Sequence, residues 1–447
     1  MPSTHFAEPA AKPHYDVAIV GAGQAGLSLS YFLQQREIDH VVFEKHSAMH
    51  VWRTRRWDNF CLVTPNWQCN LPGHAYAGTD PHGFMKRDEI TAYLDGFNLA
   101  VNAPLQEGNA VRRVAPHPSG RFGLWTAHGE CSADQVVIAS GGYHEPIIPR
   151  MAERLPSDIV QLHSEQYRNP DSLPAGAVLV VGSGQSGAQI AEDLHLAGRK
   201  VHLAVGDAPR CARFYRGRDV VDWLADMNYY DMPVHKHPLR EGVRDNTNHY
   251  VTGRDGGRDI DLRKFAVEGM ELHGRLTGFD AQLLRFTGDL GDKLDNADKI
   301  YNGINASIDK HIEKAGISAP PASTYTPLWE PEEQRLTLDP GAANITTIIW
   351  CIGFRPDFSW LDAPVFNGCG QPAHVRGVTA HPGLYFIGLP WLYTWGSGRF
   401  SGISRDAQYL AERIHAYRSD VRSRSASPAA VRLANSEIAE GSGGLAQ

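Results

Sequence analysis

A chain of 447 residues, of which 42% are hydrophobic and 21% charged, has the composition of a globular protein that buries a large core. Its 43 basic and 50 acidic side chains give a net charge of -7, which argues against nucleic-acid binding because that function needs a basic surface. The N-terminus shows no secretory signal, no apolar run approaches the length of a membrane span, and the six cysteines are scattered without a CxxC pair. We therefore expect a cytoplasmic protein with no disulfide framework, no membrane contact and no metal site.

Residues 15–44 predict a strand, a tight turn, a helix and a second strand. Residues 15–20 and 40–43 are short apolar runs suited to buried parallel strands, and residues 27–35 have helical spacing. Glu44 ends the second strand. The turn before the helix is rich in glycine and reads Gly21, Ala22, Gly23, Gln24, Ala25 and Gly26.

Each part of this first loop has a physical role in dinucleotide binding. Gly21 permits the tight turn, Gly23 lets the backbone approach a pyrophosphate, and Gly26 lets the helix pack closely on the strand. Free N–H groups at the start of the helix attract the pyrophosphate, and the Glu44 carboxylate accepts hydrogen bonds from ribose hydroxyls. A glycine-rich turn in a non-binding α/β domain is the alternative interpretation.

The same pattern returns at residues 177–205, which we interpret as a second dinucleotide-binding unit. No acid ends its second strand at Val205, and arginines follow from Arg210 to Arg218. We predict that Arg210 and Arg213 bind the 2′-phosphate of NADPH, because an acid would repel that group and arginine binds it in a bidentate manner. A solvated charged face is the alternative, and Asp207 counts against NADPH. The second loop reads Gly182, Ser183, Gly184, Gln185, Ser186 and Gly187.

Five sequence features together carry a family resemblance. They are the two glycine loops, Trp52-Arg53, the segment from His163 to Tyr167, the segment from Cys351 to Pro356, and the segment from His381 to Gly388. With these features the chain resembles the class B flavoprotein monooxygenases, which include the flavin-containing monooxygenases, the plant YUCCA enzymes and trimethylamine monooxygenase. The FxG half of one family fingerprint is absent at residues 155–159. The segment 391–400 resembles a bacterial subfamily whose genes often accompany nitrilases.

The resemblance implies FAD at the first loop and NADPH at the second, and it gives roles to particular residues. Trp52 as an ordinary core aromatic and His163 as an interdomain brace are the alternatives for those two positions. The catalytic candidates that it implies are Asn66, Trp395 and Arg399. The other implied FAD contacts are Glu44, Lys45, Trp52, Arg53, Thr64, Gln68, Ala139, Gly141, Gly388 and Leu389.

We therefore expect an α/β fold with two Rossmann-like dinucleotide-binding domains, for FAD and NADPH, and a mainly helical insertion. Two further buried strands, at residues 135–139 and 346–351, each lead into a glycine-containing segment where the chain crosses between the domains. The expected ranges are 14–150 and 332–418 for the FAD domain, 151–216 for the NADPH domain, 217–331 for the insertion as a candidate substrate lid, and 419–447 for a disordered tail.

The implied function is that of an FAD-dependent, NADPH-consuming monooxygenase. A flavin C4a-hydroperoxide transfers one oxygen atom to a small organic substrate, at nitrogen, at sulfur or by Baeyer–Villiger insertion, so that substrate and dioxygen are the expected partners. A flavin-dependent NAD(P)H oxidase or reductase without oxygen insertion is the alternative, and a non-catalytic flavin-binding regulator is a third interpretation. The assembly stays open, with a homodimer among the expected states.

Overall fold

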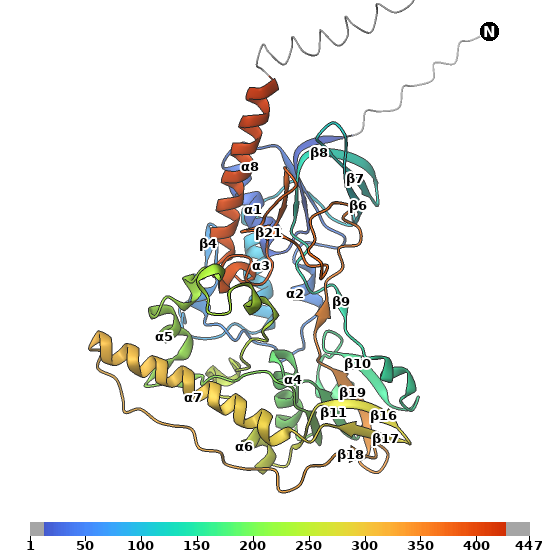
Figure 1. Cartoon of the computed structure of the whole chain (residues 1–447), viewed down its shortest axis with the longest axis vertical. Helices are drawn as coiled ribbons and strands as arrows, with labels where there is room; N and C mark the ends of the chain where they lie inside the picture. The colour runs from blue at the N-terminus through green and yellow to red at the C-terminus, as the bar shows by residue number, and fades with distance from the viewer. Residues whose placement is uncertain (1–12, 426–447) are drawn as a thin grey trace, which may run out of the picture.

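The computed structural model describes residues 13–425 of the chain, except for the side chains of residues 422–425. Two α/β units, each built on a largely parallel sheet, lie at opposite ends of the molecule and are joined by extended segments between them (Figure 1). This arrangement confirms the expected fold of two Rossmann-like domains. Of the expected disordered tail, residues 426–447 lie outside the described part of the chain.

The first sheet is built around β1, which pairs in parallel with β2 on one side and β8 on the other. An antiparallel β6–β7 hairpin extends β8, and β21 and β22 extend β23. The apolar runs predicted at residues 15–20 and 40–43 therefore form the centre of the sheet. The nine strands are β1 (His14–Val20), β2 (His40–Phe43), β5 (Leu105–Gln106), β6 (Val111–Pro116), β7 (Phe122–Thr126), β8 (Gly129–Ile138), β21 (His374–Val375), β22 (Val378–Thr379) and β23 (Leu384–Phe386).

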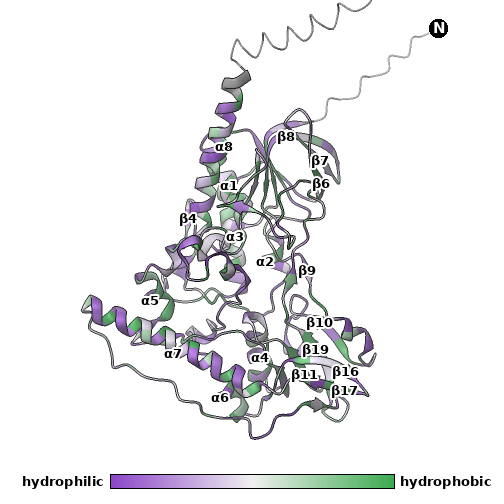
Figure 2. Ribbon diagram, viewed as in Figure 1, coloured by the Kyte–Doolittle hydropathy of each residue, from purple (hydrophilic) through white to green (hydrophobic). Residues whose placement is uncertain are grey.

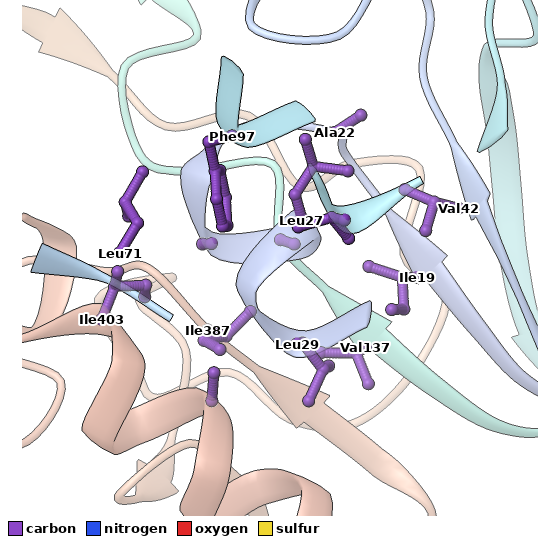
Figure 3. Close-up of a cluster of buried hydrophobic side chains, with 14 of the residues drawn as sticks. Ile19, Ala22, Leu27, Leu29, Val42, Leu71, Phe97, Val137, Ile387 and Ile403 are labelled. Atoms are coloured by element: carbon purple, nitrogen blue, oxygen red, sulfur yellow. The ribbon is translucent and has the colours of Figure 1, made fainter. Parts of the chain in front are cut away.

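Three helices cover one face of the first sheet: α1 (Gln24–Gln34), α3 (Arg87–Val101) and α8 (Ile403–Ser425). Figure 3 shows the core that they form with the sheet, in which Leu29 of α1 lies beside Val137 of β8, and Ile403 of α8 lies beside Leu71. The helix predicted from residue 27 begins at Gln24, directly after Gly23, so its first N–H groups face the glycine loop. Helix α8 continues to Ser425, past the expected start of the tail, because residues 419–425 contain neither Gly nor Pro.

The second sheet has five parallel strands in the order β10, β19, β11, β12 and β15. Helices α4 (Gln185–Leu196), α6 (Leu262–Val267) and the start of α7 (Leu290–Ala315) pack on one face. Figure 2 shows hydrophilic and hydrophobic residues alternating along α7, as expected for an amphipathic helix. The strands are β10 (Val160–His163), β11 (Ala177–Val181), β12 (Val201–Ala204), β15 (Glu271–His273) and β19 (Ile345–Trp350).

A small antiparallel sheet covers the opposite face of this second sheet together with the 3-10 helix η2 (Arg150–Arg154). The apolar side chains of Phe279, Leu284 and Phe286 in the small sheet pack against Trp350. The small sheet consists of β16 (Leu276–Asp280), β17 (Leu283–Phe286) and β18 (Thr337–Leu338).

The chain crosses between the two domains at the two places that the sequence indicated. After β8 and after β19, β9 (Glu145–Pro146) and β20 (Phe354–Arg355) pair antiparallel to each other. His163 Nε2 lies 3.1 Å from the Gly353 carbonyl oxygen, and its ring packs on Phe354, which favours its interpretation as a brace. Sheet pairing divides the chain differently from the expected boundaries, because β19 follows residue 332 but lies inside the second sheet.

Helices predominate in the insertion at residues 217–331, as expected, and they are α5 (Val220–Asp226), α6 and α7. The strand β15, however, completes the second sheet and is thus part of the nucleotide domain. Among residues 13–425, none of the helices combines the length and the apolar character needed to cross a bilayer. The short elements not yet named are α2 (His50–Thr54), η1 (Asn66–Gln68), β3 (Asn70–Leu71), β4 (His74–Ala75), η3 (Pro170–Ser172), β13 (Phe214–Tyr215), β14 (Arg218–Asp219), η4 (Tyr229–Asp231), η5 (Val234–Lys236), η6 (Arg240–Asp245), η7 (Arg254–Gly256) and η8 (Trp395–Gly398).

Candidate functional site

The three glycines of the first loop have different roles: Gly21 makes the turn, Gly26 allows helix and strand to meet closely, and Gly23 leaves open space beside the backbone. Gly21 has a φ of +113°, and a Cβ there would lie 2.7 Å from the carbonyl oxygen of Ala139. A Cβ on Gly26 would lie 2.0 Å from the carbonyl oxygen of Gly21, so that helix and strand meet closely. A Cβ on Gly23, in contrast, would meet no heavy atom within 4 Å. The space beside Gly23 at the start of α1 fits a pyrophosphate.

Glu44 lies beside this loop, at the position expected for a ribose contact. Its Oε2 accepts a hydrogen bond from the Ala22 N–H at 3.0 Å, and its Oε1 accepts one from the His46 N–H at 2.9 Å. Each carboxylate oxygen keeps a lone pair for a further donor, as a ribose hydroxyl would require. The next residue, Lys45, is exposed.

Two hydrogen bonds of Gln24 join the first loop to later parts of the chain. Trp52 Nε1 donates to Gln24 Oε1 at 3.3 Å, and Gln24 Nε2 donates to the Gly398 carbonyl oxygen at 3.3 Å. The Trp52 ring also lies 5.1 Å from that of Phe400. Arg53, the neighbour of Trp52, pairs instead with Asp95 of α3 and so has a structural partner.

Two amide side chains in the segment after Thr64, those of Asn66 and Gln68, differ in their hydrogen bonding. Gln68 is 3% exposed, and its Oε1 has no hydrogen-bond partner among residues 13–425. A buried amide oxygen without a donor is costly, and a flavin N–H group would satisfy it. Both polar atoms of the Asn66 amide have backbone partners, because its Nδ2 donates to the Asp80 carbonyl oxygen and its Oδ1 accepts from the Met85 N–H. These bonds argue against the expected catalytic role of Asn66.

The C-terminal part of the first domain closes over the start of α1. Gly388 has a φ of +79°, and a Cβ there would lie 2.6 Å from the Ala25 Cβ. Leu389 follows and packs on the core of the sheet's other face. Gly141, at the end of β8, has a φ of +77° and open space around it. Of these expected FAD contacts, Gly388 and Leu389 lie next to the first loop, and Gly141 lies just after the end of β8.

The second loop repeats the geometry of the first. Gly182 has a φ of +101°, and a Cβ there would lie 2.7 Å from the carbonyl oxygen of Cys351. A Cβ on Gly187 would lie 1.9 Å from the Gly182 carbonyl oxygen, whereas one on Gly184 would make only an ordinary contact of 3.6 Å. Gln185 Nε2 donates to the Val251 carbonyl oxygen at 2.7 Å, and Ser186 is exposed. The second loop therefore also leaves room for a pyrophosphate at its middle glycine.

A pocket of about 230 Å³ opens beside this second loop, between β11, β12 and the start of β16. Val181, Gly182, Val205 and Gly206 line it, and so does Arg275, whose guanidinium pairs with the Asp207 carboxylate. Sequence reasoning did not identify Arg275, which lies between β15 and β16, far along the chain from the second loop. The pocket lies where the adenosine end of a dinucleotide would extend from the second loop.

The structure corrects the predicted roles of Arg210 and Arg213. Arg210 is 2% exposed, pairs with Asp298 at 2.8 Å, and stacks on Tyr325 with its Cζ 3.9 Å from the ring centre. Arg213 is 1% exposed and pairs with Asp219. Buried guanidinium groups with carboxylate partners are not available to a phosphate, so that neither interpretation, phosphate clamp or solvated face, describes these two residues.

Two other arginines lack a carboxylate partner within the described residues. Arg56 stacks over Trp52 with its Cζ 4.6 Å from the ring centre, and Arg399 stacks over Trp395 at 3.8 Å. Burial lowers the pKa of both guanidinium groups, that of Arg56 to about 10, and the hydroxyl of Tyr143 lies close enough to influence both pKa values. A guanidinium group without a carboxylate partner favours an anionic ligand.

The cysteine thiols do not form a redox pair. All six cysteines are free, and Cys61 and Cys69, which flank the Thr64 segment, are buried. Burial raises the pKa of Cys61 to about 11 and that of Cys69 to about 12, so both thiols stay protonated at neutral pH. A protonated, buried thiol is a poor nucleophile, which disfavours disulfide exchange at this site.

Comparisons with known proteins agree with this geometry. Residues 18–228 match the family model described as pyridine nucleotide-disulphide oxidoreductase. The chain is 31% identical over 406 residues to an uncharacterised CzcO-like oxidoreductase of Geobacillus kaustophilus strain HTA426, covering 89% of this chain and 98% of that protein. It is 30% identical over 208 residues to the indole-3-pyruvate monooxygenase YUCCA4 of Oryza sativa subsp. japonica, covering 42% of this chain and 47% of that protein. The structure resembles a flavin-containing monooxygenase from Stenotrophomonas maltophilia, with 20% identity and a TM-score of 0.60 over 91% of this chain and 99% of that one.

The chain belongs to the family of the CzcO-like oxidoreductases, and part of it is similar in sequence to a class B flavoprotein monooxygenase, YUCCA4. It is therefore a flavin-dependent oxidoreductase enzyme. Two features of the structure agree with the dinucleotide binding expected of a class B monooxygenase: the matching geometry of the two glycine loops and the unpartnered Oε1 of Gln68. The residues that sequence reasoning missed, Arg56 and Arg275, come from segments without a glycine motif, and only the folded chain brings them to the site.

Proposed function

We propose that this class B flavoprotein uses NADPH and dioxygen to insert one oxygen atom into a small organic substrate. Bound FAD would accept a hydride from NADPH and activate dioxygen. The observation that carries the proposal is that both glycine loops leave space for a pyrophosphate, at Gly23 and at Gly184, while the cysteines near the first loop form no reactive thiol pair. Electrons that NADPH at the second loop would pass to the flavin then have no disulfide to reduce, which favours dioxygen as their acceptor.

Within this proposal the chain's own residues bind and orient the reactants. Glu44 and the start of α1 would hold the ribose and pyrophosphate of FAD, and Gln68 would accept a hydrogen bond from the flavin. Arg399, stacked on Trp395, would position an anionic group of the substrate or of NADPH. This assignment replaces a chemical role for Asn66 with a structural one.

The central test measures where the electrons of NADPH go. Anaerobic NADPH should bleach the flavin, and mixing with oxygen should then give oxygenated product when a suitable amine, sulfide or ketone is present. Product and hydrogen peroxide are quantified together for each compound of the panel. If peroxide accounts for all of the consumed NADPH with every compound, the chain is an NAD(P)H oxidase and the oxygen-insertion proposal is wrong.

The insertion is proposed to cover the substrate site, although not with its segment from Arg254 to Arg263. The run from Arg254 to Arg263 is docked on α4, because Arg254 pairs with Asp193 at 2.6 Å and Arg258 with Glu192 at 3.0 Å. A Cβ on Gly257 would lie 2.8 Å from the Phe84 ring, so this position is packed rather than free. This run therefore packs against α4 and Phe84, and we do not assign the cover to it.

A different part of the insertion reaches the first domain. The Val234 N–H donates to the Tyr393 carbonyl oxygen at 2.7 Å, and Arg399 donates to Asn248 Oδ1 at 2.9 Å. The Tyr230 ring lies 4.4 Å from that of Trp395. In Figure 1 these segments lie beside the beginning of α8, next to the first domain. They lie where a cover would exclude water from the reacting groups.

We expect Tyr230→Ala to open this cover. The change should leave FAD content unchanged and should raise the share of consumed NADPH that ends as hydrogen peroxide by about threefold or more, because water then reaches the site. Leu239→Ala, which changes an exposed side chain of the same segment, is the control and should match the parent enzyme. An unchanged peroxide share in Tyr230→Ala would show that the contact with Trp395 does not protect the reaction.

Arg275 is proposed as the group that favours NADPH over NADH. Its charge faces the pocket beside the second loop, although Asp207 competes for it. We expect Arg275→Ala to lower kcat/KM for NADPH by about tenfold while leaving that for NADH nearly unchanged, since one charge-assisted contact to the 2′-phosphate is lost. Arg285→Ala, an exposed arginine paired with Asp280 outside the pocket, is the matched control. Equal losses for both nucleotides would assign Arg275 to the shared part of the cofactor.

A further inference from the structure

Three side chains with metal-ligating atoms meet at the edge of the second sheet. His202 lies on β12, and Glu271 and His273 lie on β15, the outermost strand. The parallel register pairs His202 with Glu271 and Ala204 with His273. Because side chains of a strand alternate between its faces, all three point to the face that carries β16 and β17.

The distances among these atoms suit a single small cation. His202 Nδ1 lies 3.1 Å from His273 Nε2 and 3.6 Å from Glu271 Oε2, and one ligand atom of each residue lies within 4.8 Å of the other two. Zinc bonds of about 2.0–2.2 Å at tetrahedral angles place neighbouring ligand atoms roughly 3.3 Å apart. The three atoms thus occupy three corners of a tetrahedron with little adjustment.

The two imidazoles are enclosed by the fold. His202 and His273 are 2% and 1% exposed. The His273 ring stacks on Phe286 with its centre 4.5 Å away, which fixes its orientation. Its Nδ1 has no hydrogen-bond partner among the described residues, whereas its Nε2 lies within hydrogen-bond distance of His202 Nδ1.

Glu271 closes the site toward solvent and already has two cationic partners. Lys200 Nζ lies 2.7 Å from its Oε1, and Arg335 lies 2.6 Å from its Oε2. Both cations are largely exposed, and exposed ion pairs contribute little stability. A metal at Oε2 would displace Arg335 into solvent and leave Lys200 in place.

We propose that His202, Glu271 and His273 form a binding site for a divalent transition metal, with Zn²⁺ as the best fit. Two imidazoles and a carboxylate are ligands that Zn²⁺ accepts, and a water molecule would take the fourth position. The sequence predicted no metal site because the two histidines are 71 positions apart and share no local motif.

The place of the site in the fold indicates what the metal does. The Val205 N–H donates to the His273 carbonyl oxygen at 2.9 Å, and Ala204 and Val205 line the pocket beside the second glycine loop. A metal that joins β12 to β15 would therefore hold the edge strand against the wall of this pocket. It lies apart from the first loop, so FAD binding does not depend on it.

The test uses the full-length, tag-free, FAD-loaded protein, stripped of metals with a chelator. Titration with Zn²⁺ against a chromophoric chelator should give one equivalent bound with a Kd at or below about 1 μM. Replacement by Co²⁺ should give the visible absorption of a four-coordinate site. We expect His273→Ala to weaken Zn²⁺ binding by at least about a hundredfold and Glu271→Gln by about tenfold.

Control variants separate this site from general histidine binding and from misfolding. His195→Ala removes a histidine paired with Glu268 at 2.9 Å in the same domain, and it should bind Zn²⁺ like the parent protein. FAD content and far-UV circular dichroism are measured for every variant, and Glu271→Gln tests the site without creating a cavity in the core. The proposal is overturned if the parent protein binds no Zn²⁺ in this range. It is overturned equally if folded His273→Ala and Glu271→Gln both bind it as tightly as the parent.

Discussion

Gly23→Val is expected to yield a colourless, folded protein, and Gly184→Val a fully flavin-loaded protein that NADPH does not reduce. Both glycines begin a helix in extended backbone, with φ of −78° at Gly23 and −66° at Gly184, so valine is compatible with the backbone at both positions. A side chain at either position would enter the space proposed for a pyrophosphate. We expect the affinity for the dinucleotide at the altered loop to fall by at least about a hundredfold.

The two variants serve as controls for each other, because the change is the same and only the loop differs. FAD content is measured from the absorbance of the purified protein, and hydride transfer from the anaerobic bleaching rate with NADPH. Far-UV circular dichroism verifies that both variants are folded. If Gly23→Val retains a full complement of FAD, or if Gly184→Val loses its FAD while Gly23→Val keeps it, the assignment of the two loops is wrong.

The sequence predicted those parts of the site that depend on neighbours in the chain. The roles of Gly21, Gly23 and Gly26 follow from a spacing of a few residues, and the structure shows the expected turn, open position and close contact in that order. The second loop repeats them because its strand and helix have the same local pattern. Local patterns of this kind specify backbone geometry directly, and backbone geometry is most of what a dinucleotide cradle needs.

Side-chain roles were harder to predict because they depend on partners from distant segments. Asn66 is held by the backbone of residues 80 and 85, and Arg210 by Asp298 of α7. The sequence around Asn66 and Arg210 contains no pattern that predicts these partners. A polar side chain can bind a ligand only with donors or acceptors that the fold leaves free, and the fold alone decides which remain.

Gln68 illustrates the opposite case. The resemblance implied it as one of several flavin contacts, and the structure distinguishes it from Asn66 by its unpartnered Oε1. The two amides are separated by a single residue, lie in the same 3-10 helix η1 and are equally buried. Only their hydrogen bonds distinguish the two amides: both polar atoms of Asn66 have partners, whereas the Oε1 of Gln68 is left for a ligand.

The largest loss of stability is expected for Arg213→Ala. The Arg213 guanidinium is 1% exposed, pairs with Asp219, and donates to the Val63 carbonyl oxygen at 2.6 Å. Its removal leaves the buried Asp219 carboxylate without its counter-charge, and breaking a buried pair in this way costs about 3–5 kcal/mol. We expect the urea midpoint of unfolding, followed by circular dichroism, to fall accordingly, whereas the ratio of kcat/KM for NADPH and NADH in the remaining folded protein should not change.

Two further variants determine whether the lost charge is the cause. Arg213→Met combined with Asp219→Asn removes both charges, keeps similar volumes and preserves the oxygen that caps α5 through the Val221 N–H, so most of the stability should return. Arg275→Ala breaks the exposed pair with Asp207 and should cost less than about 1 kcal/mol while lowering the preference for NADPH. The reverse pattern, in which Arg213→Ala is stable but loses its preference for NADPH, would restore Arg213 as a phosphate ligand and remove Arg275 from that role.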